Sequence, residues 1–221
     1  MDWEAVRLSL RLALLSVVLL VPIGTALAWP LAFGRSRARL VLEALTSLPL
    51  VLPPTVLGFY LIVALGPRSP LGHAWEALTG TRLVFTFQGL LLAQLVTNLP
   101  FFLQPLVASL GGVDRRLLEA AATLGSRAPG IYLRVALPLA WRGLLSGTIL
   151  SFAHSIGEFG VVLMVGGNIP GATRTASIAL FDQVQGFDMA GANRTALLLL
   201  AFALAVLSST AWLRSRERAW N

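Results

Sequence analysis

Glu119–Pro138 reads EAAATLGSRAPGIYLRVALP, a polar, arginine-bearing segment between two long apolar segments, and it decides the fold. Asp114 is expected to cap a short helix over residues 115–124, which Gly125 would end. A second helix is expected to begin near Pro129, because proline suits the first turn of a helix. The apolar side of the first helix would consist of Leu117, Leu118, Ala121 and Leu124. A short amphipathic helix of this kind is typical of one that inserts into a groove on a soluble partner. The alternative is a helix that lies on the lipid surface.

The rest of the chain has the composition of a membrane protein. Of its 221 residues, 56% are hydrophobic and 12% are charged, and the mean hydropathy is +0.78. A soluble domain of this length could not bury so much apolar surface. A helix needs roughly 20 apolar residues to cross a bilayer. Five segments qualify: about 11–33, 43–65, 86–110, 139–165 and 192–213. We therefore predict an all-α membrane protein, a single transmembrane domain over residues 1–221, with a loop at about 112–138 between the third and fourth spans.

The basic residues predict the orientation of the chain. All seventeen are arginine, and most follow the first span, lie in or beside the central loop, or follow the fifth span. These are Arg35, Arg37, Arg39, Arg115, Arg116, Arg127, Arg134, Arg142, Arg214, Arg216 and Arg218. Because cytoplasmic segments are enriched in basic residues, the N-terminus is predicted outside and the C-terminus in the cytoplasm. Most of the net charge of +7 is explained by the arginines of these cytoplasmic segments. No aromatic–basic patch in the sequence indicates a nucleic-acid partner.

Missing residue types exclude several kinds of site. Cysteine is absent, which excludes disulfides and thiolate metal sites, and the two histidines form no metal-ligand cluster. Lysine is also absent, and a nucleotide-binding P-loop needs one. His154 and Ser155 would point about 100° apart on a helix, so they cannot form a nucleophile–base pair. No catalytic residue, cofactor or metal ligand is predicted, and any ATP would be hydrolysed by another chain.

Seven positions of the central loop resemble a motif of the permease subunits of bacterial ATP-binding cassette (ABC) importers. The motif reads EAA, three residues, Gly, nine residues, an aliphatic residue, one residue, and then LP. The chain supplies it with Glu119, Ala120, Ala121, Gly125, Val135, Leu137 and Pro138. Val135 stands where isoleucine is commoner, a departure that leaves the resemblance intact.

Three further segments resemble the molybdate permeases among these importers. They are LPLVLPPTVLGFYL (Leu48–Leu61), SIGEFG (Ser155–Gly160) and NIPGATRT (Asn168–Thr175). Sulfate and thiosulfate permeases share the GEFG segment but have longer chains, so they are the alternative. A membrane scaffold or secondary transporter outside the ABC class is the more distant alternative.

The resemblance implies a type I ABC importer permease fold in the bacterial inner membrane. It implies a homodimer of this chain in membrane lipid, a dimer of ABC ATPase subunits docked on the central loops, and a periplasmic binding protein that delivers molybdate or tungstate. Closure of the ATPase pair would move the docked loops and switch the pathway from inward-facing to outward-facing. Gly125 and Ala120 would be steric requirements, while Glu119 would orient the loop or pair with a cation of the partner.

Polar residues inside the spans are candidates to line a pathway, because they are costly in lipid and usually face a bundle interior or water. At helical periodicity two groups each share a face. Span three contributes Gln94, Thr97, Asn98 and Gln104, and span four contributes Thr148, Ser151, His154, Ser155 and Glu158. Hydroxyls and amides could replace part of an oxyanion's hydration shell. The alternative is helix packing, since Gly143 and Gly147 form a small-xxx-small pair beside the second group. Glu158 would repel a dianion, so we expect it to have a structural partner.

Overall fold

The fold is a helical bundle. The structure, a computed structural model, describes the backbone of residues 1–218 and the side chains of residues 1–209. In chain order its helices are α1 (Trp3–Phe33), α2 (Arg37–Val51), α3 (Pro54–Leu65), α4 (Pro70–Thr79), α5 (Phe87–Gly111), α6 (Arg115–Thr123), α7 (Ala128–Ile131), α8 (Leu137–Leu139), α9 (Trp141–Gly157), α10 (Gly160–Gly166), α11 (Ala176–Gln185) and α12 (Met189–Arg218). A π-helical turn, η1 (Tyr132–Ala136), connects α7 to α8. The predicted all-α class is confirmed, since residues 1–218 contain no strand.

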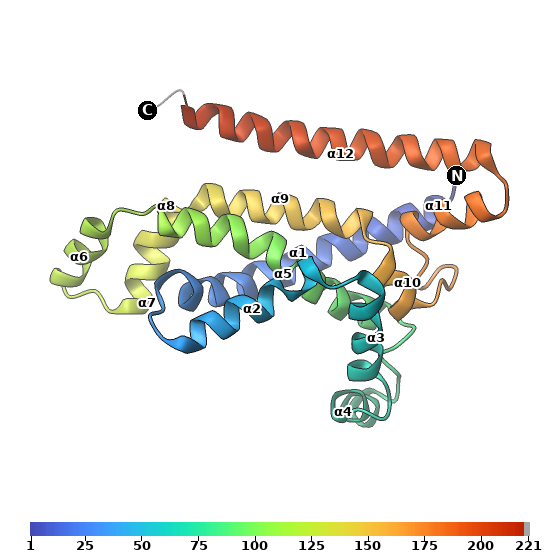
Figure 1. Cartoon of the computed structure of the whole chain (residues 1–221), viewed down its shortest axis with the longest axis horizontal. Coiled ribbons are helices and arrows are strands. Elements are labelled where there is room, and N and C mark those ends of the chain that lie inside the picture. Colours follow the sequence, from blue (N-terminus) through green and yellow to red (C-terminus); the bar gives the residue numbers. More distant parts are fainter. Residues whose placement is uncertain (219–221) are drawn as a thin grey trace.

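Helices α1, α5 and α9 form the centre of the bundle and pack most extensively against one another (Figure 1). The fully buried apolar side chains from these helices include Leu12, Leu20, Leu90, Phe102 and Leu106. Gly147 lets α9 approach α5 closely, because a Cβ atom at this position would lie 2.5 Å from the Phe102 carbonyl oxygen. This close approach is what a small-xxx-small pair permits between membrane helices.

Three helical segments are long and apolar enough to cross a membrane: α1, α5 and residues Met189–Ser209 of α12. Two bent pairs pass the same test together. One is α2 with α3, bent by 118°, and the other is Ala128–Leu139 with α9, bent by 74°. The described residues therefore contain three candidate spans, or five if each bent pair is one span. The upper value equals the number expected from the sequence.

Two segments expected as single spans are interrupted. The segment 43–65 divides into α2 and α3 at Pro53 and Pro54, because proline has no N–H and disfavours a helical conformation in the residue before it. The segment 139–165 divides at Glu158, which is extended (φ −64°, ψ 129°) between α9 and α10. Gly157 and Gly160 flank this break, and glycine weakens a helix.

Helix α1 begins earlier than the span expected from about residue 11. Its first residue is Trp3, because the Asp2 side chain caps it by accepting a hydrogen bond from the Ala5 N–H at 3.0 Å. A carboxylate at this position satisfies a donor that has no partner inside the helix. Helix α12 likewise begins at Met189, before the expected start at about residue 192.

The two ends of the bundle carry different elements. Helices α6, α7 and α8 lie at one end, and α4, α10 and α11 lie toward the other, together with the N-terminus (Figure 1). Helix α12 runs along the outside between these ends, against α9 and α11. Its exposed leucines are Leu197, Leu200, Leu204 and Leu207. Lipid or another chain is needed to cover such an apolar surface.

Candidate functional site

The central loop begins with the short helix predicted from the sequence. The Asp114 side chain caps α6 by accepting a hydrogen bond from the Arg116 N–H at 2.9 Å. Helix α6 ends at Thr123, and Gly125 follows in the left-handed conformation, with φ +82°. The Ser126 N–H then donates to the Ala121 carbonyl at 3.1 Å, which closes the end of the helix. Both the cap at Asp114 and the stop at Gly125 are therefore confirmed.

Helix α6 protrudes from the bundle, and none of its residues is buried. Leu118 is half-buried and packs against the apolar core, whereas 49% of Leu117 and 86% of Leu124 are exposed. Glu119 and Ala120 are exposed as well, and Ala121 is half-buried. The apolar side predicted for this helix is thus divided. Leu118 holds α6 to its own chain, and Leu117 and Leu124 face outward with no apolar cover.

The second half of the loop returns to the bundle through α7, η1 and α8. Tyr132 and Ala136 are buried here, and the Tyr132 hydroxyl donates to the Thr25 carbonyl of α1 at 2.6 Å. Val135 and Leu137 are half-buried, whereas Pro138 is exposed. The π-helical turn ends just before Pro138, which has no N–H to donate to a preceding carbonyl. The loop is therefore anchored to α1 at Tyr132, while α6 projects from the bundle and is held to it through Leu118.

The polar residues predicted to share faces meet in the interior of the bundle. Gln94, Thr97, Asn98, Ser151 and Ser155 are all buried. The Asn98 amide nitrogen lies 2.6 Å from Ser155 Oγ, 3.0 Å from Gln94 Oε1 and 3.2 Å from Ser16 Oγ. The Gln94 amide donates to the Ser155 carbonyl at 3.2 Å. We call Ser16, Gln94, Asn98, His154 and Ser155 the polar network. It ties α1, α5 and α9 together.

The sequence left two interpretations open for these polar residues, pathway lining and helix packing. Their burial and hydrogen bonds within one chain are what helix packing predicts. Members of the predicted groups that lie outside the polar network include Thr148 and Ser151: the Thr148 hydroxyl donates to its own helix at Leu144, and Ser151 Oγ is buried without a hydrogen-bond partner. Sequence reasoning missed Ser16. Its only signal was a hydroxyl residue within an apolar stretch of the first span.

Glu158 has structural partners at the break between α9 and α10. One carboxylate oxygen accepts a hydrogen bond from the Val161 N–H at 3.0 Å, and the other lies 3.4 Å from His154 Nε2. His154 Nδ1 lies 2.9 Å from Asn98 Oδ1, and its ring stacks on Phe101 with centroids 3.9 Å apart. The carboxylate thus caps α10 and connects the break to the polar network.

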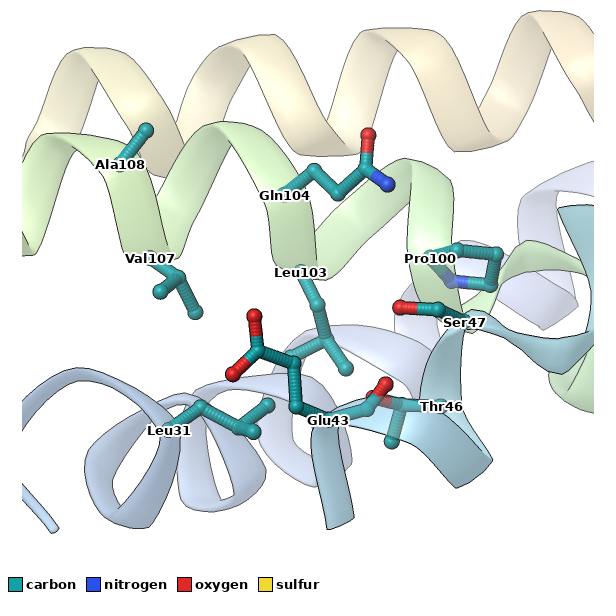
Figure 2. Close-up of a pocket in the computed structure, with 9 residues that line it drawn as sticks. All are labelled: Leu31, Glu43, Thr46, Ser47, Pro100, Leu103, Gln104, Val107 and Ala108. Carbon is teal, nitrogen blue, oxygen red and sulfur yellow. The ribbon is translucent and has the colours of Figure 1, made fainter. Parts of the chain in front are cut away.

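A second group of polar residues lies at the surface between α2 and α5. Glu43, Thr46, Ser47 and Gln104 line a cavity of about 280 Å³ there, with Leu31 and Leu103 among its apolar residues (Figure 2). Gln104 was expected on the face of Gln94 and Asn98, but it is exposed and lies away from the polar network. The polar side chains of this cavity are thus open to a neighbouring chain, whereas those of the polar network are enclosed within the bundle.

Asn98→Leu is expected to lower the free energy of unfolding by about 2 kcal/mol, because it removes an amide that contacts four side chains in the interior. Leucine has a similar volume, so little of this loss would come from a cavity. The free energy of unfolding is measured by denaturant titration of the protein in micelles. Gln104→Leu on the same helix is the matched control, with an expected effect below about 0.5 kcal/mol. Equal effects of the two substitutions would mean that the polar network contributes nothing particular to stability.

Comparison with known sequences gives one family. Residues 21–219 match a family model described as a binding-protein-dependent transport system inner membrane component. The molybdenum transport system permease protein ModB of Azotobacter vinelandii is 46% identical over 206 residues, which cover 93% of this chain and 91% of that protein. ModB of Escherichia coli K12 is 37% identical over 222 residues, with 99% and 96% covered. A probable sulfate transport system permease protein of Nephroselmis olivacea is 30% identical, with 97% and 75% covered.

Solved structures of similar shape are ABC transporters. A chain of a bacterial alginate ABC transporter, crystallised in complex with a periplasmic protein bound to an alginate pentasaccharide, superposes with a TM-score of 0.74 over 96% of this chain and 78% of that chain. A chain of an amino acid ABC transporter gives 0.65 over 97% and 93%. The sequence identities are 15% and 16%, so these similarities concern the fold alone.

Proposed function

Because the chain belongs to the family of binding-protein-dependent transport system inner membrane components, we propose that it forms the translocation pathway of an ATP-driven importer of molybdate. It is a component of the inner membrane with several apolar helices. The cargo is proposed from the relatives named as molybdenum permeases, which match almost the whole chain. Tungstate is a tetrahedral dianion like molybdate, so we include it in the proposed substrate class. The more distant sulfate relative supports sulfate as the alternative cargo.

The observation that carries this proposal is the outward face of α6. Leu117 and Leu124 are exposed on a short, capped helix at the end of the bundle, with the small Ala120 between them. An amphipathic helix of this kind fits into a groove of a partner protein. We propose that the partner is an ABC ATPase subunit and that ATP is hydrolysed there. Motion of α6 would reach α1 through Leu118 and the hydrogen bond from Tyr132 to Thr25.

The proposed assembly contains two copies of this chain, with the pathway between them. Seven of the polar residues are the predicted lining of the pathway: Gln94, Thr97, Asn98, Thr148, Ser151, Ser155 and Glu158. Thr148 and Glu158 are the two of these that are not buried within one chain. We propose that Thr148 contributes to the pathway together with Ser47 and Gln104 at the α2–α5 cavity (Figure 2). The Glu158 carboxylate would repel a dianion, and we propose that it stays with its partners Val161 and His154. Hydroxyls and amides bind an oxyanion weakly, which suits passage. A periplasmic binding protein would deliver the oxyanion at the end of the bundle that carries α4 and α11.

The proposed orientation places α6 in the cytoplasm and the N-terminus outside. The chain has no cysteine, so a single introduced cysteine can be labelled without background. In intact cells, Arg127→Cys in the central loop is expected to resist a membrane-impermeant maleimide until the membrane is opened. Arg82→Cys, at the other end of the bundle, is the control that should react from outside. Reaction of Arg127→Cys in intact cells would mean that the chain has the opposite orientation to the one proposed.

Uptake into proteoliposomes tests the proposed transport directly. The chain is assembled with its ATPase and supplied with binding protein on the outer side and ATP inside. Molybdate is expected to accumulate only with ATP, and tungstate is expected to compete while sulfate does not. Accumulation of sulfate instead of molybdate would assign the chain to the sulfate permeases. Accumulation without ATP would support a secondary transporter, and no accumulation of either anion would support a scaffold.

A further inference from the structure

Two adjoining cavities with different chemistry lie beside α6. The first, about 360 Å³, is lined by three arginines, Arg35, Arg39 and Arg115, against one glutamate, Glu119. The second, about 240 Å³, is lined by apolar and aromatic side chains that include Trp29 and Tyr132. Both cavities are lined by Phe33 and Leu118. A cationic cavity therefore adjoins an apolar one at these two side chains.

The arginines of the first cavity are poorly neutralised by the chain itself. The guanidinium groups of Arg35 and Arg115 make no hydrogen bond or ion pair with any side chain or backbone group in residues 1–209. Arg39 donates to the Gly34 carbonyl at 3.4 Å, and its Nε lies 4.0 Å from a Glu43 carboxylate oxygen. Three like charges around one cavity repel one another unless an anion occupies it. Arginine binds phosphate through two parallel N–H donors, so a phosphate group suits this cavity.

Both cavities lie where two candidate spans end. Helices α1 and α5 end at Phe33 and Gly111, and both residues line the first cavity. The Trp29 and Tyr132 rings pack against each other with centroids 4.8 Å apart, and Phe33 lies 6.4 Å from Tyr132. Aromatic residues gather at the boundary between lipid and water, and basic pockets between helices on the cytoplasmic side bind anionic head groups. This placement predicts that the arginines lie at the depth of the lipid head groups.

We infer that the two cavities together bind one anionic phospholipid, with its phosphate among Arg35, Arg39 and Arg115 and the start of an acyl chain beside Trp29 and Tyr132. A free oxyanion would occupy the first cavity and leave the apolar one unfilled. Because Leu118 lines both cavities, the bound lipid supports α6 from beneath. The inference goes beyond the proposed transport function and uses it only to place the lipid in the cytoplasmic leaflet.

The test is titration of the assembled transporter, in nanodiscs of neutral lipid, with fluorescent phosphatidylglycerol at physiological salt. Replacement of Arg35 and Arg115 together by glutamine is expected to weaken binding by roughly 30-fold, because two charge-assisted contacts to the phosphate are lost. The matched control replaces Arg37 and Arg116 by glutamine. These residues carry the same charge at neighbouring positions but do not line the cavity. Salt screening is expected to keep the effect of the control below about threefold.

Three results would overturn the inference. Equal weakening by the two double substitutions would mean that diffuse charge attracts the lipid. Displacement of the lipid by an excess of inorganic phosphate would mean that the first cavity is a site for free anions. Unchanged lipid binding with loss of the ATPase subunit from the purified complex would assign Arg35 and Arg115 to a protein contact. The titration needs neither ATP nor transported anion, so its failure is distinguishable from failure of the proposed function.

Discussion

Gly125→Trp is expected to abolish the ATP hydrolysis that loaded binding protein stimulates, while the amount of chain in the membrane stays unchanged. Gly125 has φ +82°, and within residues 1–209 no heavy atom other than those of Gly125 and its two chain neighbours lies within 4 Å of the place a Cβ atom would take. The site is therefore open at the position of a Cβ atom, and we expect an indole ring here to extend from the end of α6 into the space of the proposed partner. Docking of α6 in a groove would be blocked, and with it the coupling of ATP hydrolysis to transport.

Two further substitutions separate the effect of the ring from that of the backbone. A residue other than glycine in the left-handed conformation costs roughly 1–2 kcal/mol, and asparagine tolerates it best. Gly125→Asn is therefore expected to keep most of the stimulation, and Gly125→Ala to keep an intermediate fraction. ATP hydrolysis is measured with the purified complex in lipid, after equal amounts of ATPase subunit have been verified. Normal stimulation in the tryptophan variant would contradict the docking of α6.

Gly147→Val is expected to lower the free energy of unfolding by about 3 kcal/mol or more. A Cβ atom at Gly147 would lie 2.5 Å from the Phe102 carbonyl oxygen and 3.2 Å from the Phe102 Cα. These are backbone atoms, so the clash cannot be relieved by a change of side-chain rotamer. Helices α5 and α9 would have to separate, which would also pull apart the hydrogen bond between Asn98 and Ser155.

Gly157→Val is the matched control, because it places the same side chain on the same helix where no atom lies within 4 Å of a Cβ position. We expect it to change stability by less than about 1 kcal/mol, because valine has a somewhat higher helix propensity than glycine and its Cβ meets no close neighbour there. Unfolding is followed in micelles by the same denaturant titration for both variants. Similar stability of the two variants would show that the close contact between α5 and α9 is not needed.

Local signals in the sequence were sufficient to predict the central loop. Asp114 and Gly125 act on neighbouring backbone groups, so the start and end of α6 follow from residue type alone. The division of its apolar side did not follow. Leu117 and Leu118 are adjacent in sequence, and only the position of the bundle decides that Leu118 packs inward while Leu117 stays exposed.

The polar residues of the spans illustrate a different limit. Helical periodicity correctly grouped Gln94, Thr97 and Asn98 on one face of α5, but it cannot identify what that face contacts. In the structure the face meets α1 and α9 rather than solvent, and the lone Ser16 becomes a partner of Asn98. The arginine cavity was also beyond prediction, because Arg35, Arg39 and Arg115 come from segments that meet only in the folded chain.

The breaks in the helices differ in how far they could be foreseen. Consecutive prolines at Pro53 and Pro54 are a strong local signal, and α2 ends just before them. The break at Glu158 has only the weaker signal of Gly157 and Gly160 beside it. The Glu158 carboxylate caps α10 at Val161 and faces His154, and these contacts compensate for the helical hydrogen bonds that the break removes.

We propose that this chain couples ATP hydrolysis in a partner to the import of molybdate. The most direct measurement is the ATPase activity of the complete complex in lipid, stimulated by binding protein loaded with either molybdate or sulfate. Our account predicts stimulation by the molybdate-loaded protein and none by the sulfate-loaded protein. Stimulation by sulfate alone would contradict the proposed cargo, and no stimulation by either would contradict the coupling itself.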